Sequence, residues 1–266
     1  MSRVGWGFAA LLAVLVLLVA AVAFVTTTAG GFRGLTQTVT ALSGERLTVE
    51  GVDGHLGAPL GIRKLTLATA NQRIEIEGLR LEWQPRALWQ RRVEIDLLAA
   101  QTLRMTVLKK EPTPPPTLPA SLRLPFDVQV HVLDLARLEI VEAGKPLVFS
   151  HIRARLDGTG ERYRLSGASV QSPWADVSGQ LELGKDAPFA LQGRFDAARR
   201  DPVPVHAGLR LTGTLAAVMF ELAADAKGMS FLAHGEAAPF ARVRLPRLLV
   251  AGQGIDPRQF AADAPS

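Results

Sequence analysis

From residue 47 onward the apolar residues of this 266-residue chain recur at every second position, and this period limits the fold more than any other feature. Such alternation is typical of a β-strand with one dry face and one wet face. The segment Arg73–Glu77 (RIEIE) shows it clearly, and Phe189–Phe195 shows it again in the second half. No helical pattern longer than a turn or two follows residue 45. We therefore predict an all-β protein of many short strands.

The phase of the alternation slips once near the start. Ile74 and Ile76 hold one phase, and after Gly78 the phase passes to Leu79 and Leu81. A glycine at such a slip is what a β-bulge requires, so we predict a bulge there.

The spacing of turns, about one every ten residues, suits either a closed sandwich or barrel or an open solenoid. Residues 208–241 contain many Ala and Gly residues, which supply little volume for a dense core. We therefore favour an open, groove-like β-solenoid (a β-taco) of short antiparallel strands. Whether its apolar face is a groove or a closed core stays open at this point.

The N-terminal part has a different composition. Val4–Val25 is an unbroken apolar run of 22 residues, and a helix of that length covers a hydrocarbon core of about 30 Å. A cleaved signal peptide is the alternative, but its apolar region is typically shorter. We predict an uncleaved transmembrane anchor in residues 1–29. Arg3 precedes the run, which favours a cytoplasmic N-terminus and a periplasmic C-terminal portion.

Three further segments follow the anchor. Residues 30–44 have apolar positions at helical spacing and predict a short amphipathic helix beside the membrane. Residues 45–110 form a first β segment, and residues 111–120 are a Pro-rich linker or loop, because proline cannot continue a sheet. Residues 121–266 form a repeated β segment. No capping element closes the end at Ser266, and we expect the repeats to continue beyond it in a longer protein.

No catalytic, cofactor or metal site is evident in the sequence. There is no Cys, and none of the five His residues stands at ligand spacing from another. Acidic residues mostly alternate with apolar ones, as on the wet face of a strand. The net charge of +5 comes without a dense basic run, and the chain has one Tyr, so nucleic-acid binding is not supported. We expect a protein that is not an enzyme and that needs no cofactor.

The order of these features resembles the N-terminal region of the translocation and assembly module TamB family, in the AsmA-like group. After the anchor and the amphipathic stretch come a G-x-L segment and an L-x-L-x-W-x-P-x-x-L signature, followed by the Pro-rich break. The signature residues are Gly54, Leu56, Leu79, Leu81, Trp83, Pro85 and Leu88. The resemblance is more specific over residues 1–130 than after them.

The resemblance implies a β-taco anchored in the inner membrane that crosses the periplasm toward an Omp85-type outer-membrane protein. It also implies a role in outer-membrane protein assembly, in phospholipid transport between the membranes, or in both. An aliphatic strand face would cover acyl chains, and the residues expected to line such a groove are Ile74, Ile76, Leu81, Val93, Ile95 and Leu97. The alternative is a periplasmic scaffold that binds a protein through its exposed edge and carries no lipid.

Overall fold

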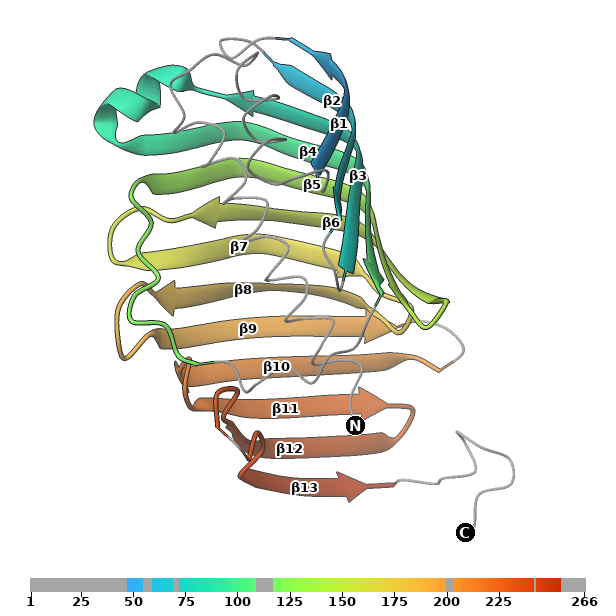
Figure 1. Ribbon diagram of the computed structural model, residues 1–266. Coiled ribbons are helices and arrows are strands. Elements are labelled where there is room, and N and C mark those ends of the chain that lie inside the picture. The colour runs from blue at the N-terminus through green and yellow to red at the C-terminus, as the bar shows by residue number, and fades with distance from the viewer. Residues whose placement is uncertain are drawn as a thin grey trace.

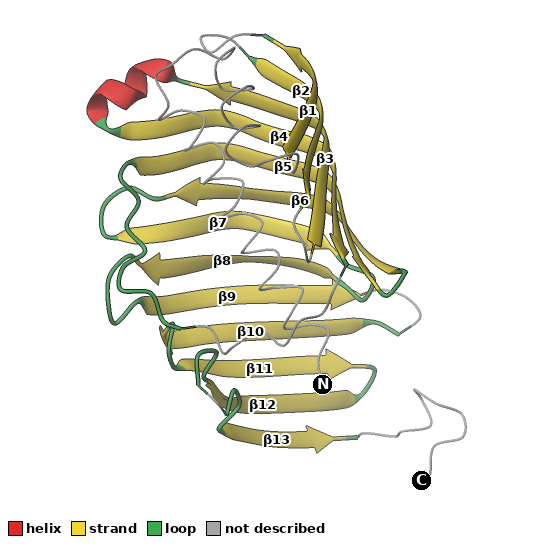
Figure 2. Cartoon of the chain, in the orientation of Figure 1, coloured by secondary structure: helices red, strands yellow, loops and turns green. Residues whose placement is uncertain are grey.

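The computed structural model describes residues 47–54, 59–68, 72–108, 117–199, 203–241 and 243–254. These residues form one sheet in which the spatial order of thirteen strands follows the chain order (Figure 1). The strands are β1 (Leu47–Asp53), β2 (Leu60–Ala68), β3 (Gln72–Trp83), β4 (Arg92–Val107), β5 (Asp127–Glu142), β6 (Lys145–Asp157), β7 (Arg162–Gln171), β8 (Asp176–Gly184), β9 (Ala190–Arg199), β10 (Val205–Thr214), β11 (Val218–Ala226), β12 (Met229–Ala237) and β13 (Arg247–Gln253). A short 3₁₀ helix, η2 (Pro85–Gln90), joins β3 to β4 (Figure 2).

The sheet is open, because β1 and β13 stand at opposite ends of the strand order and do not pair with each other. In Figure 1, β3 runs steeply whereas β7–β13 lie nearly level, so the sheet is strongly curved and twisted. The predictions of an all-β architecture and of an open rather than closed sheet are confirmed for the described residues. The predicted anchor (1–29) and amphipathic helix (30–44) lie outside these residues. Within the part that the structure describes, no helix is long and apolar enough to span a bilayer.

One strand pair departs from the predicted antiparallel pattern. β4 and β5 are parallel, with Val93 opposite Val128 and Leu103 opposite Leu138. A parallel pair needs a crossover that returns the chain to the end where the first strand began. Residues 108–126, which contain the Pro-rich segment, make this return, so the predicted linker is a crossover connection inside one sheet.

The described part of this crossover, residues 117–126, lies against the turns at one end of the strands. The Leu122 backbone N–H donates to the Lys185 carbonyl (2.8 Å), and the Tyr163 hydroxyl donates to the Leu122 carbonyl (2.7 Å). Arg123 pairs with Asp186 and with Glu161. The crossover is therefore fixed to the β6–β7 and β8–β9 connections, well beyond the two strands that it joins.

A sharp bend crosses four adjacent strands in one row. The register places Gly78 of β3, Gln101 of β4, Ala136 of β5 and His151 of β6 side by side. Gly78 and His151 have positive φ angles of 64° and 50°. We call this row the corner.

The inward-facing positions change phase at the corner in each of the four strands. On β4, for example, Leu98 faces the core before the corner and Leu103 faces it after, an odd separation that alternation alone does not allow. The phase slip predicted at Gly78 is therefore present. The predicted bulge is not at Gly78, because the pairing register between β3 and β4 is the same on both sides of it. Both strands bend together there, and the register shifts instead between Glu82 and Trp83.

Apolar side chains of the inner face form two clusters. The larger one covers β2–β6 and contains most of the fully buried side chains, including Ile95, Leu103 and Val128. The smaller one is centred on Leu181 and Phe195.

Glycines compensate for the modest volume of residues in the second half. Phe195 stands directly opposite Gly179, and Phe220 stands directly opposite Gly235. A Cβ atom at Gly179 would lie 2.4 Å from the Phe195 ring, and one at Gly235 would lie 2.7 Å from the Phe220 ring. Each aromatic ring therefore covers the backbone of the neighbouring strand in the space that the glycine leaves.

Candidate functional site

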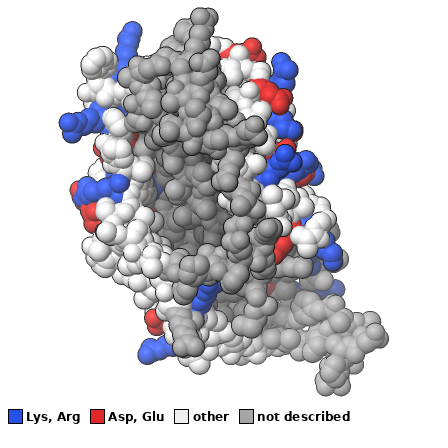
Figure 3. Space-filling model, in the orientation of Figure 1, with Lys and Arg blue, Asp and Glu red and all other residues white. Residues whose placement is uncertain are grey.

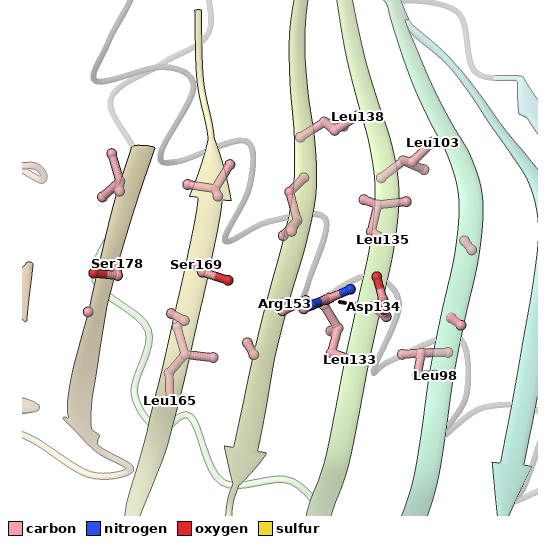
Figure 4. A pocket seen from close by; sticks show the side chains of 18 of the residues that line it. Leu98, Leu103, Leu133, Asp134, Leu135, Leu138, Arg153, Leu165, Ser169 and Ser178 are labelled. Atoms are coloured by element: carbon pink, nitrogen blue, oxygen red, sulfur yellow. Dashed lines mark ion pairs between the residues drawn. The ribbon is translucent and has the colours of Figure 1, made fainter. Parts of the chain in front are cut away.

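An apolar hollow crosses the inner face of the sheet from β3 to β9. Its enclosed volume is about 110 Å³. Leucine side chains from β4, β5 and β7 surround it, including Leu98, Leu103, Leu135 and Leu165 (Figure 4). We call this hollow the trough.

The corner explains why a hollow forms where it does. The residues that flank the corner line the trough, among them Ile76 and Leu79 on β3, and Leu135 and Leu138 on β5. At the corner itself two consecutive residues of a strand turn outward, so no side chain fills the inner face along that row. The trough therefore runs across the strands. Small residues continue it on the next strands, namely Ala168 of β7 and Gly179 of β8.

The size of the trough decides what it can hold. From β3 to β9 there are six interstrand steps of about 4.8 Å, which gives a length of about 29 Å. One acyl chain extends across roughly half of a 30 Å hydrocarbon core, so the length is sufficient for it. The enclosed volume of about 110 Å³ is smaller than the roughly 150 Å³ of an apolar cavity that binds benzene. The trough thus accommodates only a few methylene groups, and most of a longer chain would lie outside this volume.

Two charged residues, Asp134 and Arg153, are among those that line the trough. Asp134 lies between the inward-facing Leu133 and Leu135, and its carboxylate is 3.3 Å from the Arg153 guanidinium. Strand alternation directs this ion pair to the outer face. In the space-filling view, Lys, Arg, Asp and Glu side chains are visible on both sides of the molecule (Figure 3).

The same outer face carries a buried carboxylate beyond the corner. Glu139 of β5 accepts hydrogen bonds from Arg104 (2.8 Å) and Arg137 (2.5 Å). The Arg104 hydrogen bond, followed by that from Arg137, holds the pKa of the Glu139 carboxyl below its usual value.

The six residues predicted to line a groove fall into three groups. Ile74, Leu81, Val93 and Ile95 are buried members of the larger cluster and do not line the trough. Ile76 is buried and does line it. Leu97 belongs neither to the larger cluster nor to the lining of the trough. At this point β4 carries an extra residue against β3, and Leu98 takes the inward position. Five of the six residues thus lie on the inner face of the sheet, and one of them, Ile76, lines the trough.

The residues that carry the TamB resemblance lie after β1, on β3 and on η2. Gly54 follows β1, and Leu56 lies outside the described residues. Leu79, Leu81, Trp83 and Leu88 contact or belong to the larger apolar cluster, and Pro85 opens the 3₁₀ helix η2. In this structure these positions build the β3–η2–β4 connection.

The structure also brings together three side chains that the sequence analysis did not connect. Glu94, Asp96 and His131 place one ligand atom each within 4.8 Å of one another, which makes them a group that could hold a metal ion. His131 is 35 residues from Asp96 in the chain, and only the parallel β4–β5 pairing makes them neighbours. No spacing rule for hairpins or helices would have found this group.

The chain is therefore an all-β protein with one open, curved sheet and an apolar trough across its inner face. The chain has no significant match among protein-family models, curated proteins or solved structures.

Proposed function

We propose that this protein is an inner-membrane-anchored, periplasmic β-groove protein that carries the acyl chains of phospholipids between the inner and outer membranes. The observation that supports this most directly is the trough, because its lining is mostly apolar and crosses seven strands. The resemblance of the sequence to the TamB family gives the proposal its membrane setting.

The energetics favour acyl chains as the occupant. Each methylene group removed from water contributes about 0.8 kcal/mol. Most of the residues that line the trough are Leu, Ile, Val and Ala, which suits a ligand without polar atoms. Head groups would stay outside the trough, near charged side chains, where water is accessible.

The wider setting rests on the family resemblance. The protein would be a single-pass inner-membrane protein with its N-terminus in the cytoplasm, and its outer-membrane partner would be of the Omp85 type. Assistance in outer-membrane protein assembly would use the same sheet. No step in this proposal makes or breaks a covalent bond.

A photocrosslinking experiment tests the lipid proposal. Val177 of β8 lines the trough, whereas Gln180 on the same strand is exposed on the outer face, so these two positions form a matched pair. A photoreactive amino acid at position 177 should crosslink phospholipid in intact cells, and one at position 180 should not. Equal labelling at the two positions, or none at position 177, would contradict the proposal.

A charge placed in the trough provides a second test. Leu165→Glu would bury a carboxylate in an apolar surface without a partner, which an acyl chain cannot compensate. Lipid that copurifies with the wild-type chain should be lost from this variant, as measured by native mass spectrometry. Arg164→Glu on the outer face is the control and should retain the lipid.

A scaffold without lipid is the second candidate, and the edge strand β13 favours it. Every described residue of β13 is exposed, including Leu248, Leu249 and Val250. An exposed apolar edge strand can pair with a strand of another protein. Capture of an outer-membrane protein by the full chain, with no lipid copurifying, would favour this candidate.

A further inference from the structure

Three potential metal ligands meet on the outer face of β4 and β5, away from the trough. They are Glu94 and Asp96 of β4 and His131 of β5, all half-buried, with their ligand atoms within 4.8 Å of one another. His131 Nε2 lies 3.2 Å from Glu94 Oε1. Their backbone neighbours Val93, Ile95 and Val130 face the core and are at most 1% exposed, so the group stands on a rigid base.

Two irregularities in the sheet bring these side chains together. In the β3–β4 pairing the register shifts so that Asp96 is an extra residue on β4. In the β5–β6 pairing the register shifts between Val130 and Leu133, in the segment that contains His131. Bulges of this kind redirect side chains and are common beside functional sites. The parallel β4–β5 register then sets Asp96 next to His131.

Glu94 has His131 as its partner, and neither carboxylate of the group has a lysine or arginine partner of its own among the described residues. Among the described residues, no Lys or Arg side chain comes within 4.0 Å of Glu94 or Asp96. Asp96 instead accepts hydrogen bonds from the neutral Gln84 side-chain amide at 3.0 and 3.3 Å. Other carboxylates on this face, such as Glu139, have arginine partners. Two acidic groups held together without a lysine or arginine beside them form a site that favours a bound cation.

We propose that Glu94, Asp96 and His131 bind a divalent transition-metal ion of the zinc class. One imidazole nitrogen and two carboxylate oxygens, completed by a water molecule, are a ligand set that Zn²⁺ accepts in tetrahedral geometry. Mg²⁺ and Ca²⁺ prefer oxygen ligands alone, so the imidazole selects against them. Gln84 orients the Asp96 carboxylate, as outer-shell hydrogen bonds commonly do at metal sites. The ion would connect β4 to β5, the parallel pair of the sheet.

Titration of the purified 266-residue chain with ZnCl₂, followed by calorimetry and by thermal unfolding, tests this proposal. The chain contains no Cys, so thiolates cannot compete. One Zn²⁺ should bind per chain and raise the melting temperature, whereas MgCl₂ should have no effect. His131→Gln should weaken binding more than tenfold, and Gln84→Ala should weaken it by roughly tenfold because it removes an outer-shell partner. Co²⁺ in place of Zn²⁺ should give the visible absorption of a tetrahedral ion.

The matched control is His206→Gln, which changes an exposed histidine on β10 and should leave the affinity within twofold of the wild type. The isosteric variants Glu94→Gln and Asp96→Asn keep the shape of the site, and circular dichroism checks that they fold. Unchanged affinity in His131→Gln, equal loss in His206→Gln, or absence of saturable Zn²⁺ binding would each overturn the proposal. The site would then be a simple Glu94–His131 ion pair. This test is independent of lipid binding in the trough.

Discussion

Two charged side chains are buried among the described residues, and both hold parts of the sheet together that are distant in sequence. Lys185 lies under the crossover, where its ammonium group is 3.1 Å from the Asp127 carboxylate and also donates to the Gly158 carbonyl. The Tyr163 ring adds a cation–π contact at 5.0 Å. Glu139 is fixed by two arginines. Such residues are almost never buried unless paired, and neither could be recognised from strand alternation.

Replacement of Lys185 by Met tests its structural role. The Gly158 carbonyl would lose a buried donor and the Asp127 carboxylate would lose its ammonium partner, whereas the Lys185 carbonyl that accepts from Leu122 would remain. The free energy of unfolding should fall by about 1–3 kcal/mol, the usual cost of a buried group left without its partner. Urea denaturation followed by circular dichroism measures it. Lys227→Met, at an exposed turn, should change stability by less than about 0.5 kcal/mol. An equal effect in both variants would argue against this role.

The two arginine partners of Glu139 predict that part of the stability of the protein is lost in acid. Because its arginine partners hold the pKa below the unfolded value of about 4.3, the ionised carboxylate contributes stability above that pH. This contribution is lost as the pH falls through the lower folded-state pKa. The drop in melting temperature from pH 7 to pH 3 should therefore be smaller in Glu139→Gln than in the wild type. Glu221→Gln, at an exposed ion pair, should keep the full drop. The same slope in wild type and Glu139→Gln would contradict the prediction.

At the scale of elements, the corner shows what a sequence can and cannot reveal about a sheet. The phase slip at Gly78 was visible, because a glycine separates two alternating runs. The matching slips at Gln101, Ala136 and His151 were not, because none of these residues is a typical bend former. They bend because they pair with, or lie in the same row as, Gly78. The location of the trough depends on this row and therefore could not be predicted from one strand.

Substitution of Gly78 by Ala tests the corner directly. A Cβ atom at Gly78 would lie 2.6 Å from the Gln101 side chain, and φ is 64°. Gly160 has a φ of 66° with no atom within 4 Å of such a Cβ, so Gly160→Ala carries the backbone strain alone. In each variant, backbone strain should lower the free energy of unfolding by about 1 kcal/mol. In Gly78→Ala, the close contact with Gln101 should lower the free energy of unfolding by about 1 kcal/mol more.

The double variant Gly78→Ala/Gln101→Ala completes this cycle. Removal of the Gln101 side chain should recover the additional loss, and the double variant should then match Gly160→Ala in thermal unfolding. If Gly78→Ala costs no more than Gly160→Ala, the space between β3 and β4 does not constrain the corner.

For the whole molecule, the all-β class and the open sheet followed from alternation and from the small residues of the second half. The parallel β4–β5 pair did not, because a Pro-rich break reads as a linker whether the chain continues outward or returns. The residue sets of the trough and of the Glu94–Asp96–His131 group depend on that pair. Long-range register therefore limits prediction of the sites more than prediction of the fold.

Among the described strands, β13 stands at one end of the sheet and pairs on one side only. Its neighbour β12 satisfies one side of its backbone, while Leu249 is 63% exposed and Val250 is 55% exposed. Lysine on an edge strand is a common means by which proteins prevent strand-to-strand association, because pairing would bring its charge against another strand.

Leu249→Lys should therefore reduce concentration-dependent association in sedimentation velocity, with little change in melting temperature because the side chain is already in water. Met219→Lys adds the same charge to an exposed position inside the sheet, on β11, and should not reduce association. Association that is equally strong in wild type and Leu249→Lys would mean that the edge of β13 is not the surface through which copies meet.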